Sequence, residues 1–333
     1  MNKIDFVVTW VDGNDPEWRA EKDKYLPKAT VDAAKNRYRD MGIFRYWFRA
    51  VEAYAPWVNK VHFITWGHLP EWLNRNCKKL NIVNHKDYIP DKFLPTFSSR
   101  PIELNIHRIK DLSEHFVYFN DDILLNAPVK ESFFFKKGLP CDFANITNNY
   151  FENLEDMYAH GLTNSITLIN KKFSYIKSFF KHPTKFLRPC YGVKCNLKNI
   201  LKLENTCVFS GFEEHHLAMS CLKKTYEDLW EDYETELSKT SESKFRTATD
   251  VNNAIIRYRQ LAEGKFSPVS KKSRGQAFSI SEDNSKIIEA INSSKYKVIC
   301  INDSPYITDF EKAEAEIVKA YEKKLPKKSE FEL

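Results

Sequence analysis

Short, nearly continuous apolar runs alternate with amphipathic stretches along the first third of this 333-residue chain. Runs of that kind are typical of buried strands, whereas apolar residues at helical spacing, or a proline in a first turn, indicate helices. We expect strands over 4–12, 60–67, 80–85 and 115–125, and helices over 41–57, 69–77 and 101–112. Strands and helices in alternation predict an α/β fold with a mostly parallel central sheet.

The pattern becomes less regular after residue 130. An aromatic and basic stretch covers 174–192, and the remaining elements that we expect are helices over 215–237, 250–266 and 309–325 and an apolar strand over 297–303. The predicted organisation is an α/β core over 1–130, a mostly helical insertion over 131–295 after the fourth strand, and a last core strand with a C-terminal helix over 296–333.

Two strands that lie far apart in the chain end in Asn-Asp. FVYFNDDILL (116–125) contains Asn120, Asp121 and Asp122, and VICIND (298–303) ends at Asn302 and Asp303. Adjacent carboxylates between apolar runs are costly unless something compensates their charge. A turn cap is one explanation, and a hard divalent cation that bridges phosphate oxygens is another. Because ligands of α/β sheets bind beyond the carboxyl ends of strands, both endings are candidate ligand sites.

The composition narrows the classes of function. The formal net charge of +6 suits anionic ligands but does not require nucleic acid, since no basic stripe carries regularly spaced aromatic residues. The 9 glycines form neither GxGxxG nor GxxxxGK[ST], so the usual dinucleotide and P-loop signatures are missing. The amino end lacks a signal-peptide pattern, and 7 cysteines without CxxC favour free thiols in a cytoplasmic protein.

Two alternatives stay open at this stage. Cys190 and Cys195 could pair or hold a metal. The basic C-terminal tail could contact the inner face of the cell membrane, although a solvated helix is the simpler interpretation. The sequence does not fix the oligomeric state.

Further polar residues lie near the expected strand ends. Asp12 to Asp15 have turn composition and follow the first strand, where a turn can also contact a ligand. His107 and Arg108 precede the strand that ends in Asn-Asp-Asp, and the planar fork of an arginine suits phosphate.

The insertion carries its own candidates. His215 and His216 stand at an expected helix start, where they could bind zinc, face solvent, or accept a proton from a hydroxyl nucleophile. Arg246 precedes a helix expected to begin at Asp250, which is either an anion site or a solvated basic loop.

Several stretches together resemble the Stealth proteins, a family that includes bacterial capsule polysaccharide phosphotransferases and animal N-acetylglucosamine-1-phosphotransferase. The matching stretches are 4–18, 37–74 with 85–129, 215–252, and CINDS at 300–304. The resemblance implies transfer of hexose-1-phosphate, such as N-acetylglucosamine-1-phosphate, from a UDP-hexose to a hydroxyl of a growing surface polysaccharide. A phosphodiester would form and UMP would leave. The resemblance also implies a Rossmann-like core related to GT-A glycosyltransferases and a need for Mg²⁺ or Mn²⁺.

The resemblance carries over residue by residue onto three groups. The group near the nucleotide is Asp12, Gly13, Asp15, Arg39, Asp40 and His107; the cation ligands are Asp122, Asn302 and Asp303; the catalytic group is His216, Asp121, Arg246 and Arg108. His216 is the candidate general base, with Asp121 as the alternative. Ala218 stands where the family often has proline, and Ser304 where it often has Asp or Asn.

Two other functions use the same residues. A metal-dependent glycosyltransferase would form a glycosidic bond and release UDP. A carbohydrate- or cation-binding module would bind without turnover, and it leaves the His and Arg residues in distant segments unexplained.

Overall fold

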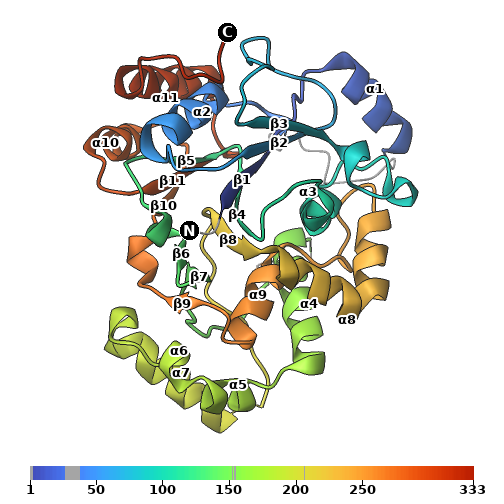
Figure 1. Cartoon of the computed structure of the whole chain (residues 1–333), viewed down its shortest axis with the longest axis vertical. Coiled ribbons are helices and arrows are strands. Elements are labelled where there is room, and N and C mark those ends of the chain that lie inside the picture. Colours follow the sequence, from blue (N-terminus) through green and yellow to red (C-terminus); the bar gives the residue numbers. More distant parts are fainter. Residues whose placement is uncertain (1–2, 27–37, 152, 154, 206) are drawn as a thin grey trace.

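The computed structural model describes residues 3–26, 38–151, 153, 155–205 and 207–333. Its central sheet has the strand order β3-β2-β1-β4-β8 (Figure 1). The strands are β1 (Ile4–Thr9), β2 (Val61–Thr65), β3 (Leu80–Asn84), β4 (His115–Asn120) and β8 (Met219–Leu222). β1 to β4 are parallel and β8 is antiparallel to β4, which confirms the mostly parallel α/β sheet. The carboxyl ends of the four parallel strands therefore share one edge.

A second sheet joins the two Asn-Asp endings. It has the order β10-β11-β5, with β10 at Gln276–Ser279, β11 at Val298–Asn302 and β5 at Ile123–Leu125. The chain turns from β4 directly into β5, which pairs antiparallel with β11. The Ile301 amide donates a hydrogen bond of 2.9 Å to the Asp122 carbonyl. The expected strand over 297–303 thus exists, but it lies in this second sheet. A small third sheet combines β6 (Phe135–Lys136), β7 (Leu139–Asp142) and β9 (Ser267–Pro268).

Helices cover both faces of the central sheet (Figure 1). Phe6 and Val8 of β1 point into one core with α2 (Phe44–Tyr54), α10 (Ser285–Ser293) and α11 (Phe310–Lys324). Val7 points into the other core, as the period of two along a strand requires. That second core contains α3 (Ser99–Leu104), α4 (Met157–Lys172), α8 (Lys223–Glu242) and α9 (Ala254–Ala262).

The remaining helices are α1 (Pro16–Tyr25), α5 (Tyr175–Lys181), α6 (Pro183–Phe186) and α7 (Val193–Asn205). Tyr175 and Phe179 of α5 and Phe186 of α6 extend the second core. Among the described residues, none of the helices combines the length and the apolar character that crossing a lipid bilayer requires.

Three expected elements differ in the structure. Residues 69–77 form turns rather than a helix, and the helix expected over 101–112 ends at Leu104, followed by a 3₁₀ turn over Ile106–Arg108. The expected helix over 215–237 begins only at Lys223, because Met219–Leu222 pairs with β4 as a strand. A short apolar run does not distinguish strand from helix by its spacing. The insertion therefore contributes a strand to the central sheet.

A buried ion pair fastens the C-terminal segment to α2. The Arg49 guanidinium donates to Glu332 at 2.7–3.1 Å and to the Leu325 carbonyl at 2.8 Å. Both side chains are buried, at 8% and 2% exposure. The C-terminal segment, for which membrane contact or a solvated helix was expected, is thus anchored to the folded core.

We predict that Glu332→Ala lowers the free energy of unfolding by about 3–5 kcal/mol, because Arg49 would stay buried without its carboxylate. Urea denaturation followed by circular dichroism measures this change. Glu330→Ala, two residues away and exposed, is the matched control and should change stability by less than about 0.5 kcal/mol. Equal effects of the two substitutions would refute the anchoring role.

Candidate active site

Two cavities lie side by side at the carboxyl edge of the central sheet. Their volumes are about 390 and 400 Å³. Both are lined by Ser99, Asn120, His216, Arg246 and Asn302, which form a shared wall. Asn120 is the last residue of β4, and Asn302 is the last residue of β11. The site therefore forms where the two Asn-Asp endings meet.

The larger cavity, which we term the aromatic cavity, combines four aromatic side chains with a buried histidine. The aromatic residues are Trp10, Trp18, Tyr38 and Phe97. His85, which follows β3, is only 8% exposed, and its Nδ1 has no hydrogen-bond partner within the described residues. Burial lowers the pKa of His85 to about 3. The imidazole is therefore neutral at physiological pH and offers one donor and one acceptor.

The other cavity, the polar cavity, is built on buried charges. Arg257 donates to Asp142 at 2.9 Å and to Glu214 at 3.1 Å. The Tyr118 hydroxyl lies 3.0 Å from a Glu103 carboxyl oxygen. Burial raises the pKa of Glu103 and of Glu214, and it outweighs the opposing effect of nearby arginines. The cavity thus presents fixed donors and acceptors at several angles.

The adjacent aspartates sit where their charge is poorly compensated. The Asp122 Oδ2 atom lies 3.5 Å from His216 Nε2 and 3.5 Å from Cys300 Sγ. Its Oδ1 atom is buried, and the described part of the chain gives it no hydrogen-bond partner. Burial, with added repulsion from Asp122 and Asp40, raises the pKa of Asp121 to about 8. For His216, burial lowers the pKa, but Asp122 leaves it above its ordinary value.

These donors fit a divalent cation. The oxygen atoms of Asp121, Asp122 and Asn302 border the aromatic cavity and suit Mg²⁺ or Mn²⁺. Donor atoms of Asp122, His216 and Cys300 lie within 4.8 Å of one another, and the sulfur and nitrogen of that group suit softer metals.

Asp303, the third expected ligand, also lines the aromatic cavity, but its carboxylate is paired with Arg39. Its carboxylate accepts two hydrogen bonds from Arg39, at 2.9 and 2.7 Å. Both residues line a hollow of about 110 Å³ next to the aspartates, together with Asp40. The structure therefore brings Arg39, Asp40 and Asp303 to the edge of the site, with Arg39 as the counter-charge of Asp303.

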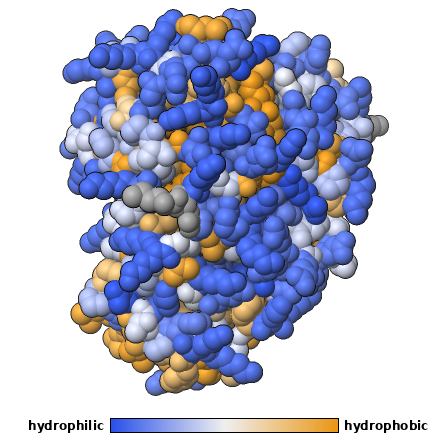
Figure 2. Space-filling view, viewed as in Figure 1, coloured by the Kyte–Doolittle hydropathy of each residue, from blue (hydrophilic) through white to orange (hydrophobic). Residues whose placement is uncertain are grey.

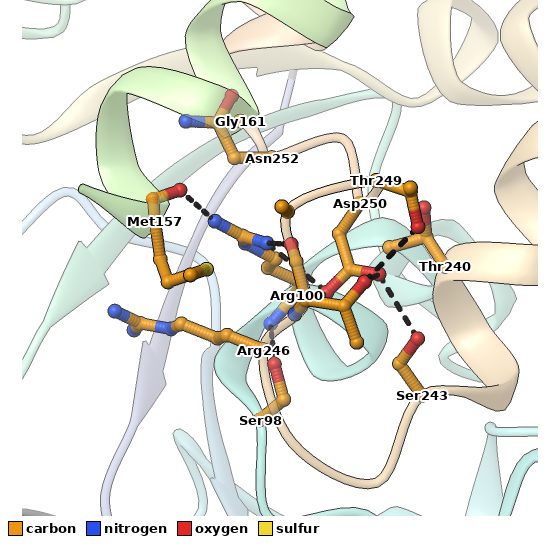
Figure 3. A network of polar contacts seen from close by, with 12 residues as sticks. Ser98, Arg100, Met157, Gly161, Thr240, Ser243, Arg246, Thr249, Asp250 and Asn252 are labelled. Atoms are coloured by element: carbon orange, nitrogen blue, oxygen red, sulfur yellow. Dashed lines mark hydrogen bonds and ion pairs between the residues drawn. The ribbon is translucent and has the colours of Figure 1, made fainter. Parts of the chain in front are cut away.

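A buried ion pair holds the loop that carries Arg246. Asp250 pairs with Arg100 at 3.0 Å and accepts the Thr247 amide at 2.8 Å. Figure 3 shows the Arg100 guanidinium between Asp250 and the Met157 carbonyl, to which it also donates. Arg246 itself donates to the Ser99 hydroxyl at 3.1 Å. The loop expected to be either solvated or anion-binding is thus fixed, and it presents Arg246 to both cavities.

The turn between β1 and α1, which contains Asp12, Gly13 and Asp15, supports the aromatic cavity from behind. Asp15 caps α1 by accepting the Trp18 amide, and the Asp12 amide donates to His68. A side chain at Gly13 would clash with the Tyr38 carbonyl, 2.0 Å from its Cβ position. These three expected nucleotide contacts do not border the cavities, whereas Trp18 does. The turn therefore helps to position Trp18 in the lining of the aromatic cavity.

His107 and Arg108 are placed away from the cavities. His107 is buried against Tyr226 and Trp230, and burial followed by the charge of Arg108 lowers its pKa to about 3. The Arg108 guanidinium lies over the Trp230 ring, 4.6 Å from its centroid. The cause is the early end of α3, because the 3₁₀ turn that follows directs His107 into the core.

Sequence reasoning did not select several residues that line the cavities. They are His85, Arg100, Glu214 and Arg257. A usable signal existed for Arg257, since a charged residue within the apolar helix AIIRYRQLA is costly unless it is paired. His85 gives no comparable signal, because nothing in its local sequence places it in a cavity.

Family profiles and individual relatives of known name both match this chain. The profile of Stealth protein CR1, conserved region 1, matches residues 2–30, and that of Stealth protein CR2, conserved region 2, matches 37–141. A capsular polysaccharide phosphotransferase WcwK of Streptococcus pneumoniae is 42% identical, covering 100% of this chain and 99% of the relative. A receptor polysaccharide phosphotransferase WefC of Streptococcus oralis is 40% identical, covering 100% of each.

Further matches include an exopolysaccharide phosphotransferase cps2G of Lactiplantibacillus plantarum, 38% identical over 99% of this chain and 96% of the relative. Among solved structures, the galactosyltransferase LgtC in complex with donor and acceptor sugar analogs has a TM-score of 0.38 and 11% identity, and it covers 95% of each chain.

The crowded carboxylates predict a stability change for Asp121→Asn. Folding raises the pKa of Asp121 from 3.8 to about 8, so the folded state disfavours the ionised carboxylate. This penalty is small at and below pH 3.8 and grows as the pH rises toward 8. Without divalent cations, the variant should be more stable than the parent near pH 7.5 by about 5 kcal/mol, since each pKa unit corresponds to about 1.4 kcal/mol, and nearly equally stable near pH 4.

Calorimetry with EDTA and with excess Mg²⁺ measures both effects. We expect Mg²⁺ to raise the melting temperature of the parent more than that of Asp121→Asn. Asp23→Asn on the exposed side of α1 is the control and should behave like the parent. A variant that is less stable than the parent at pH 7.5 would contradict the repulsion.

Proposed function

The chain belongs to the Stealth family and is a transferase, and we propose that it transfers hexose-1-phosphate from a UDP-sugar to a hydroxyl of a growing surface polysaccharide. N-acetylglucosamine-1-phosphate is one such group. The product is a phosphodiester and the leaving group is UMP. We propose a cytoplasmic enzyme that uses Mg²⁺ or Mn²⁺. Relatives named capsular and exopolysaccharide phosphotransferases support a polysaccharide acceptor.

One observation carries the proposal: two cavities of different chemistry meet at a wall that suits phosphate. The aromatic cavity suits a nucleoside, because nucleobases stack on aromatic side chains. The polar cavity suits sugar hydroxyls, which need fixed donors and acceptors. The shared wall offers Arg246, His216 and Asn302 to the atoms between nucleoside and sugar. A nucleotide sugar has this order of parts.

His85 is the proposed contact for the nucleobase. Its imidazole is neutral, borders the aromatic cavity and has an unpartnered buried nitrogen among the described residues. A ring N–H would donate to a base carbonyl, and an unprotonated ring nitrogen would accept from a base N–H. Uracil offers both partners. The nearby aromatic residues Trp18 and Phe97 would hold the plane of the base.

The reaction moves one phosphoryl group that carries the sugar. The acceptor oxygen bonds to the phosphorus attached to the hexose, and the bond from that phosphorus to the oxygen bridging to UMP breaks. The acceptor proton passes to His216 Nε2, and UMP leaves with the bridging oxygen. The glycosidic C–O bond stays intact. Arg246 spreads the negative charge on the transferring group, which is where most catalysis of phosphoryl transfer arises.

A divalent cation held by Asp122 and Asn302, with Asp121 nearby, would neutralise charge on the diphosphate. With Asp122 engaged in this way, His216 would lose the contact that raises its pKa, so a larger fraction of its imidazole would be unprotonated, as a general base must be. Asp121 is the alternative base, because its pKa of about 8 lies near working pH. We assign no direct role to Arg108 or His107, since both lie outside the cavities.

A glycosyltransferase reaction would use the same cavities but attack the sugar carbon and release UDP. We predict UMP as the released nucleotide when the protein is incubated with Mg²⁺, an oligosaccharide acceptor and a panel of UDP-sugars. Chromatography separates UMP from UDP, and phosphorus NMR of the product should show a diester signal. Release of UDP with a phosphorus-free product would establish the glycosyltransferase, and no turnover with any UDP-sugar would overturn the proposal.

His216→Ala should lower kcat about 10²–10⁴-fold, because a general base contributes that much to the rate. The free energy of unfolding and UMP affinity, measured by urea denaturation and calorimetry, should change little. His182→Ala is the control, since His182 borders neither cavity, and it should retain full activity. Turnover by His216→Ala within tenfold of the parent would remove His216 from this role and favour Asp121.

A further inference from the structure

Helices α5, α6 and α7 lie together at one end of the molecule (Figure 1), where α5 and α6 pack on the second core. We define this basic lobe as residues 174–205. It lies at the opposite end of the view from α11. Asn199 anchors the inner face of α7, because its side chain accepts the Ile146 amide at 3.0 Å and donates to the Ala144 carbonyl at 2.9 Å. The opposite face of α7 is left to solvent.

The basic lobe carries the charge of the whole chain. It contains seven basic residues and one acidic residue, Glu204, for a net charge of +6. The complete chain also has a net charge of +6, so the rest of the protein is neutral on balance. The basic residues are Lys177, Lys181, Lys185, Arg188, Lys194, Lys198 and Lys202. A positive field of this kind is local to one end of the molecule.

The same lobe exposes large apolar side chains. Val193, Leu197 and Ile200 are 84%, 53% and 43% exposed. They recur at i, i+4 and i+7 and therefore form one stripe along α7. Phe180, the penultimate residue of α5, is 69% exposed. Figure 2 shows apolar residues gathered along the lower edge of the molecule, which is the end that holds these helices.

A basic stripe runs beside the apolar one. Lys194, Lys198 and Lys202 recur at i, i+4 and i+8 and are centred about 130° around the helix from the apolar residues; the Lys202 ammonium also donates to the Asn148 side chain. Lysine stems can lie along an apolar surface while their ammonium groups reach outward to anionic groups. An exposed apolar stripe flanked by lysines is the pattern of a helix that lies in a membrane interface.

We propose that the basic lobe docks this protein on an anionic lipid surface, with the apolar stripe of α7 and Phe180 inserted at the headgroup level. Charge complementarity selects this partner: a second copy would bring two lobes of net charge +6 together, which repel. An acidic polysaccharide would satisfy the lysines but would leave the apolar stripe in water. The anchored C-terminal segment, where sequence reasoning placed possible membrane contact, is at the other end.

Docking in this way would place the two cavities at a defined distance from the bilayer surface. Tyr158, near the start of α4, borders the polar cavity, and α4 ends at Lys172 next to α5. Its 16 residues span about 24 Å. The polar cavity would therefore sit on the order of 24 Å from the bilayer, within reach of an acceptor chain that is held at the membrane. This last step rests on the proposed function, but the docking itself does not.

Vesicle co-sedimentation tests the proposal with the full chain. The parent should bind phosphatidylglycerol vesicles and bind phosphatidylcholine vesicles at least tenfold more weakly. Lys194→Gln/Lys198→Gln/Lys202→Gln should weaken binding to the anionic vesicles about a hundredfold, because each surface lysine contributes about fivefold. The matched control removes three exposed lysines at the same spacing from α11 and the residues beyond it, as Lys319→Gln/Lys323→Gln/Lys327→Gln. It should bind within about threefold of the parent.

A second variant separates docking from simple charge attraction. Val193→Ser/Leu197→Ser/Ile200→Ser keeps every charge, and we expect it to lose at least tenfold in vesicle affinity. Circular dichroism checks folding, and release of nucleotide with a soluble acceptor should be unchanged, since none of these residues borders the aromatic or the polar cavity.

Four outcomes would overturn the inference. They are absence of vesicle binding by the parent, equal losses in the α7 and control lysine variants, unchanged binding by the serine variant, or a parent dimer that the serine variant dissociates in analytical ultracentrifugation. The first three leave the proposed reaction untouched. Failure of nucleotide release would instead overturn the reaction without affecting vesicle binding.

Discussion

The structure around the site is organised by the burial of neighbouring carboxylates at the end of β4. Burial of Asp121, with added repulsion from Asp122 and Asp40, raises its pKa to about 8. Such crowding persists only if the surrounding fold is strong enough to impose it. The pairing of β5 with β11 supplies part of that strength, since the Ile301 amide is bonded to the carbonyl of Asp122 itself. The carboxylates are thus held in place through their backbone while their side chains remain available to a cation.

Counter-charges near the aspartates come from segments that are distant in the chain. Arg39 neutralises Asp303, His216 contacts Asp122, and Arg246 lines the wall between the cavities. Buried ion pairs hold the segments that carry them: Arg100 with Asp250 behind the loop of Arg246, and Arg257 with Asp142 and Glu214 behind the polar cavity. Pairs of this kind contribute little net stability, because burying charges costs about what their attraction returns. In this protein they hold polar side chains in fixed positions along the cavities, which apolar residues could not do.

Much of this arrangement could be predicted from local sequence, and the remainder depends on long-range pairing. The strands β1 to β4 and the helices α2, α9 and α11 follow from apolar spacing, and the strand-end rule located Asn120, Asp122 and Asn302. Met219–Leu222 was mistaken for helix because its four residues carry no decisive period, and only pairing with β4 makes it a strand. Arg108 matched a family position, yet the end of α3 at Leu104 turns it away from the cavities. His85 could not be selected, because its burial and its missing partner exist only in the folded chain.

The position of the shared wall bears on which bond would break. If the nucleoside occupies the aromatic cavity and the sugar the polar cavity, the wall with His216 and Arg246 faces the diphosphate rather than the sugar carbon. A glycosyltransferase needs its base beside the attacked carbon, beyond both phosphates. Here the crowded aspartates, the imidazole and the arginine all gather at one boundary, so positioning and charge stabilisation act on phosphorus. The same fold could therefore support either reaction, and the location of its charges along the bound nucleotide sugar favours transfer of the sugar together with its phosphate.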